Sequence, residues 1–415
     1  MLFRVLITVF IKPIVFVFLS INFSVYAISP LPVILISIDG LANDYLKLYQ
    51  PKNILALANS GVKAKALLPV YPSKTFPNHL SIVTGVYPAK HGIIHNKFYR
   101  PDLHKQYTLG AGKEHSEWLT AMPIWTVAEK QGIKTAIYFW PESEARIAGQ
   151  LPSYYFPYQH NTPNLERINQ LIDWLKLPQD KRPQLLLSYF SSLDSAGHNF
   201  GPDSIEVQQA LHDIDNLIGL LMKRLKDEIN QEVNVVLVSD HGMTSIEPNA
   251  IDIESLIPNN TLFTLVNGQT QLLIYSDYLP VIKKIKSQLL SNPIAIRSKY
   301  RVYLKNDYPK HWQMKGQLKA IPDLIVEAIA PATFTDQGKQ MGAATHGFDP
   351  KMNRNLDAIF IANGPSFNTN QVIEAFENIH IYPLLIEVLG LDNINSVDGD
   401  IKVLKPIIRK KANLH

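Results

Sequence analysis

Acidic and histidine side chains stand where several apolar runs of this sequence stop. Asp240 and His241 follow one such run directly, Asp39 closes another, and Asp194 and His198 follow a third. Runs that are apolar at every position are typical of strands buried on both faces of a parallel sheet. Open α/β sheets bind their ligands beyond the carboxyl ends of such strands. The sequence therefore predicts that these side chains meet at one edge of a sheet.

Carboxylates and imidazoles gathered in this way are suited to divalent metal ions. The chain contains no cysteine, which excludes disulfides, thiolate metal sites and a cysteine nucleophile, and leaves oxygen and nitrogen ligands for Zn²⁺, Mn²⁺ or Mg²⁺. His346, in the downstream stretch THG, completes a set of six ligands, which is three for each of two metals. Taken singly, each residue is more typical of a turn, a cap or a helix-surface pair, so the prediction depends on the whole set.

Thr75, in the stretch KTFPNH, is the candidate nucleophile. Pro77 fits the first turn of a helix that continues to Gly85 with Thr75 as its N-cap, so a hydroxyl and free backbone N–H groups meet at a helix N-terminus, which favours anions. A threonine hydroxyl needs an adjacent base or cation to act as a nucleophile, and no histidine-based triad motif surrounds this one. We expect direct coordination to one metal of a two-metal site that stabilises in-line displacement at phosphorus. The alternative is an ordinary N-cap.

Strands and helices alternate along most of the chain. This order predicts an α/β fold with a mostly parallel sheet covered by helices on both faces. The apolar runs that end in the acidic ligands are the expected core strands. A different pattern follows them, with a hairpin around Asn267-Gly268, a helix and a further strand. We therefore expect a catalytic domain made of residues 28–248 and 336–415, with a small α+β insertion at residues 249–335.

Composition indicates an ordinary globular protein. With 415 residues, 46% of them hydrophobic and 18% charged, the chain can bury a large core. A net charge of +4, without a basic stripe of interleaved aromatics, gives no support for a nucleic-acid partner. Residues 1–27 combine two early basic residues with an apolar run and end in VYA, which fits signal-peptide cleavage after Ala27 and a periplasmic or secreted protein. Because Lys12 and Pro13 interrupt the run, an uncleaved N-terminal anchor is the alternative.

A series of short motifs resembles one known family. The order IDG, KTFPNH, HGIIxN, FWP, DxxGH, SDHGM and THG is similar to that of the nucleotide pyrophosphatase/phosphodiesterases of the alkaline phosphatase superfamily, over about Leu31 to Gly390. The resemblance implies an alkaline-phosphatase-like fold. The calcium-binding and disulfide-rich modules of animal relatives have no counterpart, which indicates a bacterial type with a single catalytic domain. The resemblance also implies one zinc held by Asp39, Thr75, Asp240 and His241, and a second held by Asp194, His198 and His346.

The same resemblance implies roles for residues around the phosphate. Thr75 would form a covalent nucleotidyl- or phosphoryl-enzyme that a zinc-bound water later hydrolyses. Asn96 would donate from its side chain to a phosphate oxygen, beside the backbone N–H of Phe76. The base of a nucleotide would stack on Phe76, Tyr158 and Tyr189.

Two further positions bear on the substrate. Lys74 precedes the nucleophile, as it does in many members of the family, and is expected to contact the substrate. Glu142 follows FWP where the family often has a small residue. A carboxylate at that position is expected either to disfavour an anionic substrate tail or to recognise a cationic head group.

Several functions fit this set of residues. The first is a di-zinc phosphodiesterase that acts on the diester or pyrophosphate bonds of nucleotides. A phospholipid or choline-ester phosphodiesterase and a phosphomonoesterase are alternatives on the same site, and a metal-stabilised extracellular binding protein is the non-enzymatic alternative. A monoesterase needs extra positive charge for its more anionic substrate, and no arginine accompanies Thr75, so diesters and pyrophosphates are favoured.

Overall fold

An eight-stranded sheet forms the centre of the protein. The computed structural model describes residues 30–257, 261–336, 341–394 and 396–409. From edge to edge, the order of the sheet is β19 (Gln371–Ile373), β2 (Val62–Ala64), β18 (Phe360–Asn363), β9 (Asn234–Val238), β1 (Val33–Ile38), β8 (Leu185–Phe190), β6 (Thr135–Tyr138) and β7 (Tyr154–Phe156). Strand β18 runs antiparallel to both of its neighbours, and the other pairs are parallel. The predicted mostly parallel sheet is therefore confirmed.

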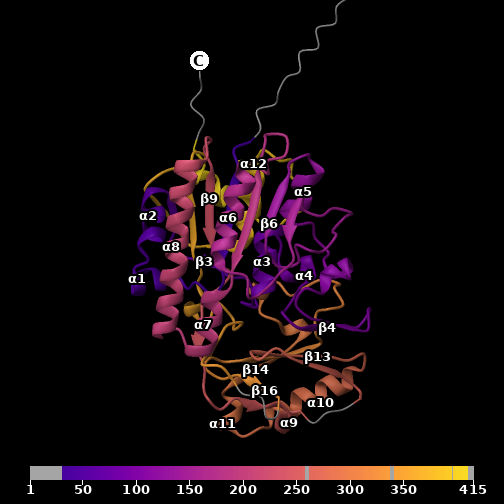
Figure 1. Cartoon of the computed structure of the whole chain (residues 1–415). Helices are drawn as coiled ribbons and strands as arrows, with labels where there is room; N and C mark the ends of the chain where they lie inside the picture. The colour runs from indigo at the N-terminus through magenta and orange to yellow at the C-terminus, as the bar shows by residue number, and fades with distance from the viewer. Residues whose placement is uncertain (1–29, 258–260, 337–340, 395, 410–415) are drawn as a thin grey trace, which may run out of the picture.

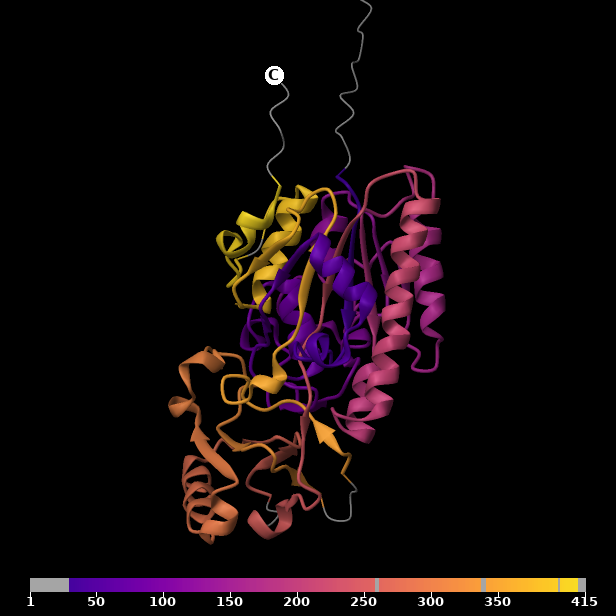
Figure 2. The same cartoon turned by 90° about the vertical axis from the view of Figure 1, so that its left-hand side faces the viewer.

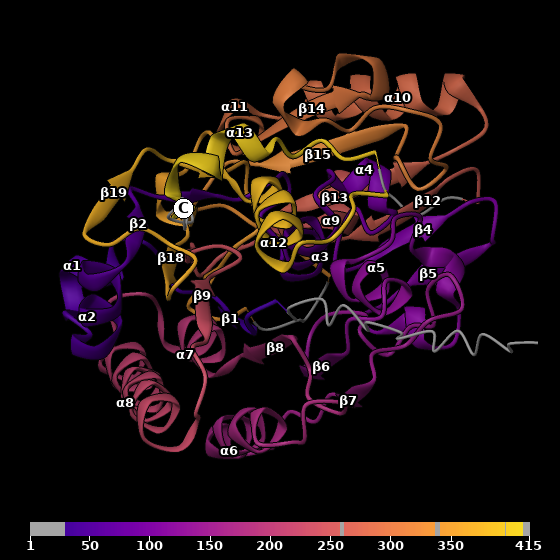
Figure 3. The ribbon, with the colours of Figure 1, turned by 90° about the horizontal axis from the view of Figure 1, so that it is seen from above.

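Helices cover both faces of this sheet (Figure 3). One face carries α2 (Lys52–Ser60), α6 (Asn164–Leu175) and α8 (Ile205–Glu228), and the other carries α3 (Thr75–Thr84), α5 (Ile124–Lys130) and α12 (Ile381–Leu389). Helix α8, the longest, begins after Ser204, whose side chain accepts a hydrogen bond from the backbone N–H of Val207. Such an N-cap satisfies one of the free amides at the start of a helix.

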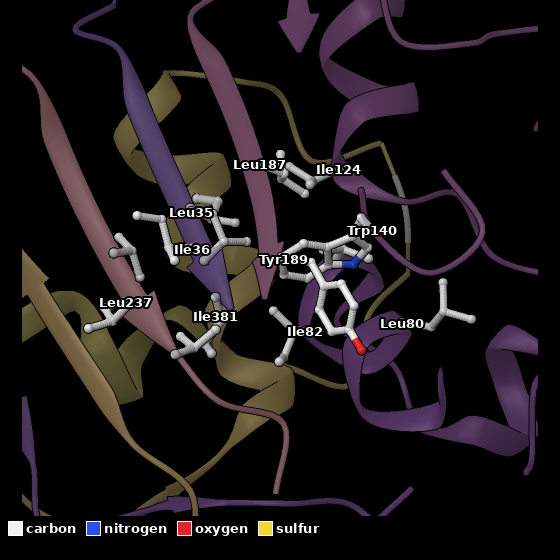
Figure 4. Close-up of a cluster of buried hydrophobic side chains, with 14 of the residues drawn as sticks. Leu35, Ile36, Leu80, Ile82, Ile124, Trp140, Leu187, Tyr189, Leu237 and Ile381 are labelled. Carbon is white, nitrogen blue, oxygen red and sulfur yellow. The ribbon is translucent and has the colours of Figure 1, made fainter. Parts of the chain in front are cut away.

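The three central strands β1, β8 and β9 are buried along their whole length. Figure 4 shows Leu35 and Leu187 of the sheet gathered with Ile82, Ile124 and Ile381 from the helices of the second face. The sheet has no free polar face here, which explains why the strand sequences are apolar at successive positions and do not alternate. Packing against helices on both faces fixes the position of each strand end, and therefore the position of the residues that follow it.

A smaller unit lies beyond the carboxyl ends of the central strands (Figure 1, Figure 2). It contains an antiparallel sheet in the order β12 (Thr264–Asn267), β13 (Gln271–Tyr275), β15 (Leu324–Ala328) and β14 (Tyr300–Leu304), with helices α9 (Ile253–Leu256), α10 (Leu279–Leu290) and α11 (Ile294–Arg297). The predicted hairpin corresponds to β12 and β13. The unit has a hydrophobic cluster of its own. The limits at residues 249 and 335 stay a prediction.

Short elements complete the described chain. They are the helices α1 (Tyr45–Tyr49), α4 (Pro88–His91), α7 (Ser192–Phe200) and α13 (Ile401–Leu404), and the paired strands β3 (Leu67–Leu68) with β20 (Phe376–Glu377), β4 (Phe98–Arg100) with β5 (Lys105–Tyr107), β10 (Thr244–Ser245) with β17 (Ala344–Thr345), and β11 (Ile251–Asp252) with β16 (Phe334–Thr335).

Two stretches of sequence predict a local structure that the fold does not adopt. The segment after Trp140 is rich in proline and tyrosine, which predicts an irregular surface segment, yet Tyr154–Phe156 forms the edge strand β7. The run VKAKALLPV predicts one strand, and it divides into two that belong to different sheets. Among the described residues, no helix combines the length and the apolar character that crossing a membrane requires. The expected signal segment, residues 1–27, lies outside the described residues.

Candidate metal centre and active-site cavity

Neighbouring strands place the three acidic candidates side by side. Strand β1 pairs with β9 on one side and with β8 on the other. Asp39 follows β1 directly, Asp240 comes two residues after β9, and Asp194 lies in the first turn of α7, just after β8. Because these parallel strands end at the same edge, residues that are far apart in sequence converge there. The backbone N–H of Gly40 donates to Oδ1 of Asp240 at 3.2 Å, which ties two of the strand ends together.

The first group of ligand-type side chains consists of Asp39, Asp240 and His241. Nε2 of His241 lies 3.0 Å from Oδ2 of Asp240 and 3.5 Å from Oδ1 of Asp39. All three residues are buried. They are the residues that the sequence assigns to one metal.

The second group surrounds Asp194. Its carboxylate lies 3.5 Å from Nε2 of His198 and 3.7 Å from Nε2 of His346. The rings of His346 and His241 stack with their centroids 3.6 Å apart, so the two groups adjoin. Asp194, His241 and His346 also offer ligand atoms close enough together to share a cation. The structure thus brings together all six carboxylate and imidazole candidates.

Hydrogen bonding prepares each imidazole to bind a metal. Nδ1 of His241 faces the carbonyl oxygen of Gly242 at 2.9 Å, Nδ1 of His346 faces that of Ser73 at 2.9 Å, and Nδ1 of His198 faces that of Ala344 at 3.0 Å. A carbonyl only accepts, so each Nδ1 carries the proton and each Nε2 keeps a lone pair directed at the carboxylates. This outer hydrogen bond is the usual partner of a metal-binding histidine.

Each of the three carboxylates has one oxygen that accepts no hydrogen bond from the described residues. These oxygens, which are all buried, are Oδ1 of Asp39, Oδ1 of Asp194 and Oδ2 of Asp240. Buried oxygens of this kind are costly unless a cation or a donor meets them. The donor set and its orphaned oxygens therefore fit a pair of divalent ions.

Crowding of these acids perturbs their ionisation. Burial raises the pKa of Asp39, and the carboxylates of Asp194 and Asp240 raise it further. Burial also raises the pKa of Asp194. Burial opposes the charge of Asp240 as well, but the imidazoles of His241 and His79 outweigh it and hold its pKa well below the usual range. Concentrated negative charge in a dry site is the condition that bound cations relieve.

Thr75 lies beside the first group. Helix α3 begins at Thr75 itself, and its N-cap is Lys74, so the expectation that Thr75 would cap the helix was wrong. The hydroxyl of Thr75 makes no capping bond and lies 3.3 Å from Nε2 of His241. It is therefore directed at the ligand cluster, at the N-terminal end of a helix whose dipole favours an anion.

Asn96 joins the start of the same helix. Its Oδ1 accepts a hydrogen bond from the backbone N–H of Phe76 at 3.0 Å. This bond differs from the expectation that the Phe76 amide would be free for a phosphate oxygen. It orients the Asn96 side chain, with Oδ1 used as an acceptor and Nδ2 left as the donor toward the cavity.

A cavity of about 520 Å³ is lined in part by four of the candidate metal ligands, Asp39, Asp194, His198 and His346. This size is ordinary for a small-molecule site. Phe76, Tyr158 and Tyr189, which are expected to stack on a base, also line it, and that role stays a prediction. Tyr158 is 46% exposed, whereas Tyr189 is buried and its hydroxyl donates to Oδ2 of Asp39. The position of Tyr189 thus couples the cavity wall to a candidate metal ligand.

Two expected substrate contacts differ from what the structure contains. Lys74 is buried, is not among the residues that line the described cavity, and donates from Nζ to the carbonyl oxygen of His346 at 2.8 Å. Burial lowers the pKa of Lys74 to about 8. Glu142 does line the cavity, but only 4% of it is exposed, and its carboxylate accepts a hydrogen bond from the hydroxyl of Tyr107. Neither charge is free to meet a ligand as expected.

His79 was not singled out from the sequence. It lies one helical turn after Thr75, and Nδ1 faces the carbonyl oxygen of Thr75 at 2.9 Å and Oδ2 of Asp240 at 3.4 Å. Nε2 accepts from the hydroxyl of Ser37 at 2.8 Å. The histidine therefore ties Ser37 of β1 to the first turn of α3, beside Asp240. Its spacing from Thr75 in KTFPNH was the available signal, since residues four apart share a helix face.

Comparison with known proteins finds relatives that are named as phosphodiesterases and nucleotide pyrophosphatases. At the level of sequence, it is 34% identical to the venom phosphodiesterase of Naja atra over 87% of this chain and 44% of that protein. It is 35% identical to ectonucleotide pyrophosphatase/phosphodiesterase family member 3 of Bos taurus over 87% of this chain and 42% of that protein. The chain thus spans less than half the length of these relatives.

Solved structures show a similarity to the same group of proteins. The human ectonucleotide pyrophosphatase/phosphodiesterase 5 matches with a TM-score of 0.84 and 26% identity, over 91% of this chain and 100% of that one. An inactive threonine-to-alanine variant of the murine protein, in complex with AMP, matches with a TM-score of 0.83 and 25% identity over the same shares. The family model described as type I phosphodiesterase / nucleotide pyrophosphatase matches residues 33–349. The chain therefore belongs to the type I phosphodiesterase / nucleotide pyrophosphatase family.

Proposed function

We propose that this chain is an exported phosphodiesterase that hydrolyses phosphodiester or pyrophosphate bonds of nucleotides, with two zinc ions and Thr75 as nucleophile. The observation that carries the proposal is the position of the Thr75 hydroxyl, 3.3 Å from Nε2 of His241 and at the inner end of an aromatic-lined cavity. A hydroxyl that merely capped a helix would face the backbone. Export is proposed from the pattern of residues 1–27.

Aspartate and histidine ligands without cysteine suit zinc. One ion would be held by Asp39, Thr75, Asp240 and His241, and the other by Asp194, His198 and His346. When bound, the ions supply positive charge that activates the attacking hydroxyl and neutralises charge developing at phosphorus.

The residues of the chain supply the covalent chemistry. Oγ1 of Thr75 releases its proton to solvent and bonds to phosphorus, while the bond from phosphorus to the leaving oxygen breaks and that oxygen departs with the electron pair. Water then cleaves the bond between phosphorus and Oγ1, which releases the phosphate monoester and restores the hydroxyl. Nδ2 of Asn96 would donate to a phosphate oxygen, while the Phe76 amide stays bonded to Oδ1 of Asn96.

The charge of the cavity favours diesters. No lysine or arginine is among the described residues that line it, whereas Glu142 and Glu144 are. A monoester brings a second negative charge that nothing beyond the ions would balance. The aromatic rings of Phe76 and Tyr158 suit a planar base, and AMP is the ligand in the murine relative. We therefore favour a nucleotide over a lipid or choline ester, since Glu142 is occupied by Tyr107 and does not present a free carboxylate to a cationic head group.

Substitution of Thr75 tests the nucleophile. Thr75→Ala is expected to lower kcat for thymidine 5′-monophosphate p-nitrophenyl ester by about 10³-fold or more, while bound zinc stays at the wild-type level. Thr75→Ser keeps a hydroxyl and should retain part of the rate. The matched control is Thr84→Ala at the end of the same helix, where the hydroxyl donates to the carbonyl oxygen of Leu80. Near-wild-type turnover by Thr75→Ala would remove this residue from the mechanism.

A substrate panel tests the specificity. The nucleotide ester should exceed p-nitrophenyl phosphate and p-nitrophenyl phosphorylcholine in kcat/KM by at least about tenfold. Preference for the phosphorylcholine ester would replace the nucleotide by a choline ester, and preference for the monoester would make the protein a phosphatase. Zinc-loaded protein that cleaves none of the three would indicate a metal-stabilised binding protein.

A further inference from the structure

Two separate segments that line the cavity lie against each other. Leu109 and Gly110, which follow β5, contribute one wall. The adjoining wall is the segment from Trp140 to Glu144, which follows β6. We call these the 109–113 wall and the 140–144 wall. Because they follow different strands, the contacts between them fix the position of one wall relative to the other.

Glu142 joins the two walls. Its carboxylate accepts a hydrogen bond from the hydroxyl of Tyr107, at the base of the 109–113 wall. Oε2 also lies against the backbone of Gly112, where a Cβ atom would come within 2.2 Å of it. Burial raises the pKa of Glu142 to about 7, and the Tyr107 hydroxyl and the amides of Gly112 and Gly110 act in the opposite direction. The carboxylate is thus enclosed by the 109–113 wall and Tyr107.

The backbone at Glu142 is unfavourable for this residue type. Its φ is +62°, in the left-handed region that glycine adopts readily and a long side chain seldom adopts. Such a conformation costs about 1 kcal/mol or more and persists where surrounding contacts hold it. A glutamate at this position therefore adopts an unfavourable backbone conformation, which the contacts of its carboxylate stabilise.

A second acidic residue makes a parallel link. Oε2 of Glu144 lies 3.1 Å from Nζ of Lys113 on the 109–113 wall. Its Oε1 accepts a hydrogen bond from the backbone N–H of Tyr158 at 3.0 Å. This outer link is exposed and therefore weak, so it supports the buried one and does not replace it.

We propose that Glu142 is a positioning residue that clasps the 109–113 wall to the 140–144 wall and so determines how tightly the cavity holds the organic group that stays on phosphorus. The inference rests on the proposed function, because that group is the nucleoside of a nucleotide substrate. The hydrogen bond between Glu142 and Tyr107 involves neither Thr75 nor a candidate metal ligand. Its loss should therefore weaken binding of the nucleoside and leave the chemical step intact.

The test compares two esters that share a leaving group. Thymidine 5′-monophosphate p-nitrophenyl ester carries a nucleoside, and methyl p-nitrophenyl phosphate carries only a methyl group. Glu142→Gly relieves the strained φ and removes the clasp. It should raise KM for the nucleotide ester about tenfold, change kcat less than about threefold, and leave kcat/KM for the methyl ester within about twofold of the wild type.

Two further variants keep the test decisive. Tyr107→Phe deletes one oxygen, keeps the ring stacked on Phe98 at a centroid distance of 4.8 Å, and should raise the same KM in the same direction. Glu142→Gln keeps an acceptor for the Tyr107 hydroxyl and should recover part of the affinity. The control is Glu114→Gln, an exposed residue next to the 109–113 wall, which should behave as wild type.

The outcomes separate the clasp from the function. Equal losses on both esters, or an unchanged KM in Glu142→Gly and Tyr107→Phe, would overturn the clasp and leave the phosphodiesterase intact. If the zinc-loaded wild type cleaves neither ester, the proposed function itself fails. Should Glu142→Gly not fold, the pattern in Tyr107→Phe decides.

Discussion

The hydroxyl of Tyr189 donates a hydrogen bond to Oδ2 of Asp39. The tyrosine is the penultimate residue of β8 and the aspartate follows β1, so the bond crosses between neighbouring strands at the point where the candidate metal ligands begin. It leaves Oδ1 of Asp39 without a partner among the described residues, facing Nε2 of His241 at 3.5 Å. One carboxylate oxygen is thereby held by the protein and the other is left for a cation. Figure 4 shows that Tyr189 also packs beside Trp140 in the core cluster.

Removing this hydroxyl should weaken the metal site. Tyr189→Phe keeps the ring and releases Asp39, and loss of such an orienting bond typically costs about 10–100-fold in metal affinity. Competition with a chelator measures the affinity directly. Tyr158→Phe is the matched control, because that hydroxyl lies 3.2 Å from Oγ of Ser191 and contacts no ligand carboxylate. Equal zinc affinity in the two variants would contradict the orienting role.

Metal removal should lower stability as well as activity. The three orphaned carboxylate oxygens are buried, so loss of the cations leaves uncompensated negative charge at adjoining strand ends. At a free zinc concentration of 100 times Kd, each ion stabilises the fold by about 2.7 kcal/mol. Thermal unfolding with and without a chelator measures the change, and added zinc should reverse it. The inactive Thr75→Ala protein should show a similar shift, and a chelator-insensitive melting temperature would count against a buried metal pair.

The convergence of ligands could be predicted from sequence because it depends on one local signal repeated. The end of each apolar run can be located in the sequence, and parallel pairing of the strands brings these ends to one edge of the sheet. Asp39 and Asp240 stand at such ends. The mostly parallel sheet followed from the same runs.

Roles that depend on distant partners could not be predicted in this way. Lys74 was expected at the substrate, but its donation to the carbonyl oxygen of His346 joins residues 272 positions apart. The enclosure of Glu142 requires Tyr107, 35 positions away in the chain. Strand β7 was missed because Tyr154–Phe156 pairs at the edge of the sheet with β6, and its sequence shows no core pattern. Local sequence patterns identify side chains that could do chemistry, whereas tertiary packing determines which partner each of them contacts.

Glu327 should make stability depend on pH. This residue of β15 accepts hydrogen bonds from the hydroxyl of Tyr71 at 2.6 Å and from Nε2 of Gln271 at 2.9 Å. Burial raises its pKa from 4.5 to about 8, against the effect of these bonds. A raised pKa means that the folded state binds the proton more tightly than the unfolded state. The resulting stability is present at low pH and is lost as pH rises toward 8.

Glu327→Gln removes this titration. Between pH 5 and pH 8 the wild type should lose on the order of 3 kcal/mol more unfolding free energy than the variant, as judged by denaturant titrations at both pH values. Any pH-independent effect of the glutamine side chain on the unfolding free energy cancels in this difference. Glu254→Gln, at an exposed position of the same unit, is the control and should follow the wild type. Parallel pH profiles for Glu327→Gln and the wild type would show that this carboxyl is not the source.

Gly40 provides a test of how closely the strand ends must approach. Its φ is +70°, and a Cβ atom there would lie 3.0 Å from Cα and 3.2 Å from Oδ1 of Asp194. Gly132 has a similar φ of +80°, but a Cβ atom there would meet nothing within 4 Å. Alanine at either position adds backbone strain of about 1 kcal/mol, so both variants should unfold more easily by a similar amount.

Only Gly40→Ala should also displace a metal ligand. A contact of 3.0 Å requires Asp194 to move by a few tenths of an ångström, which shifts a candidate metal ligand and should lower the rate. We expect Gly40→Ala to lose zinc affinity and kcat together, while Gly132→Ala keeps both at its reduced stability. Measuring zinc content and turnover well below the melting temperatures separates the two effects. If both variants retain full activity, Asp194 tolerates displacement and the close approach of α7 to the end of β1 is not needed for the site.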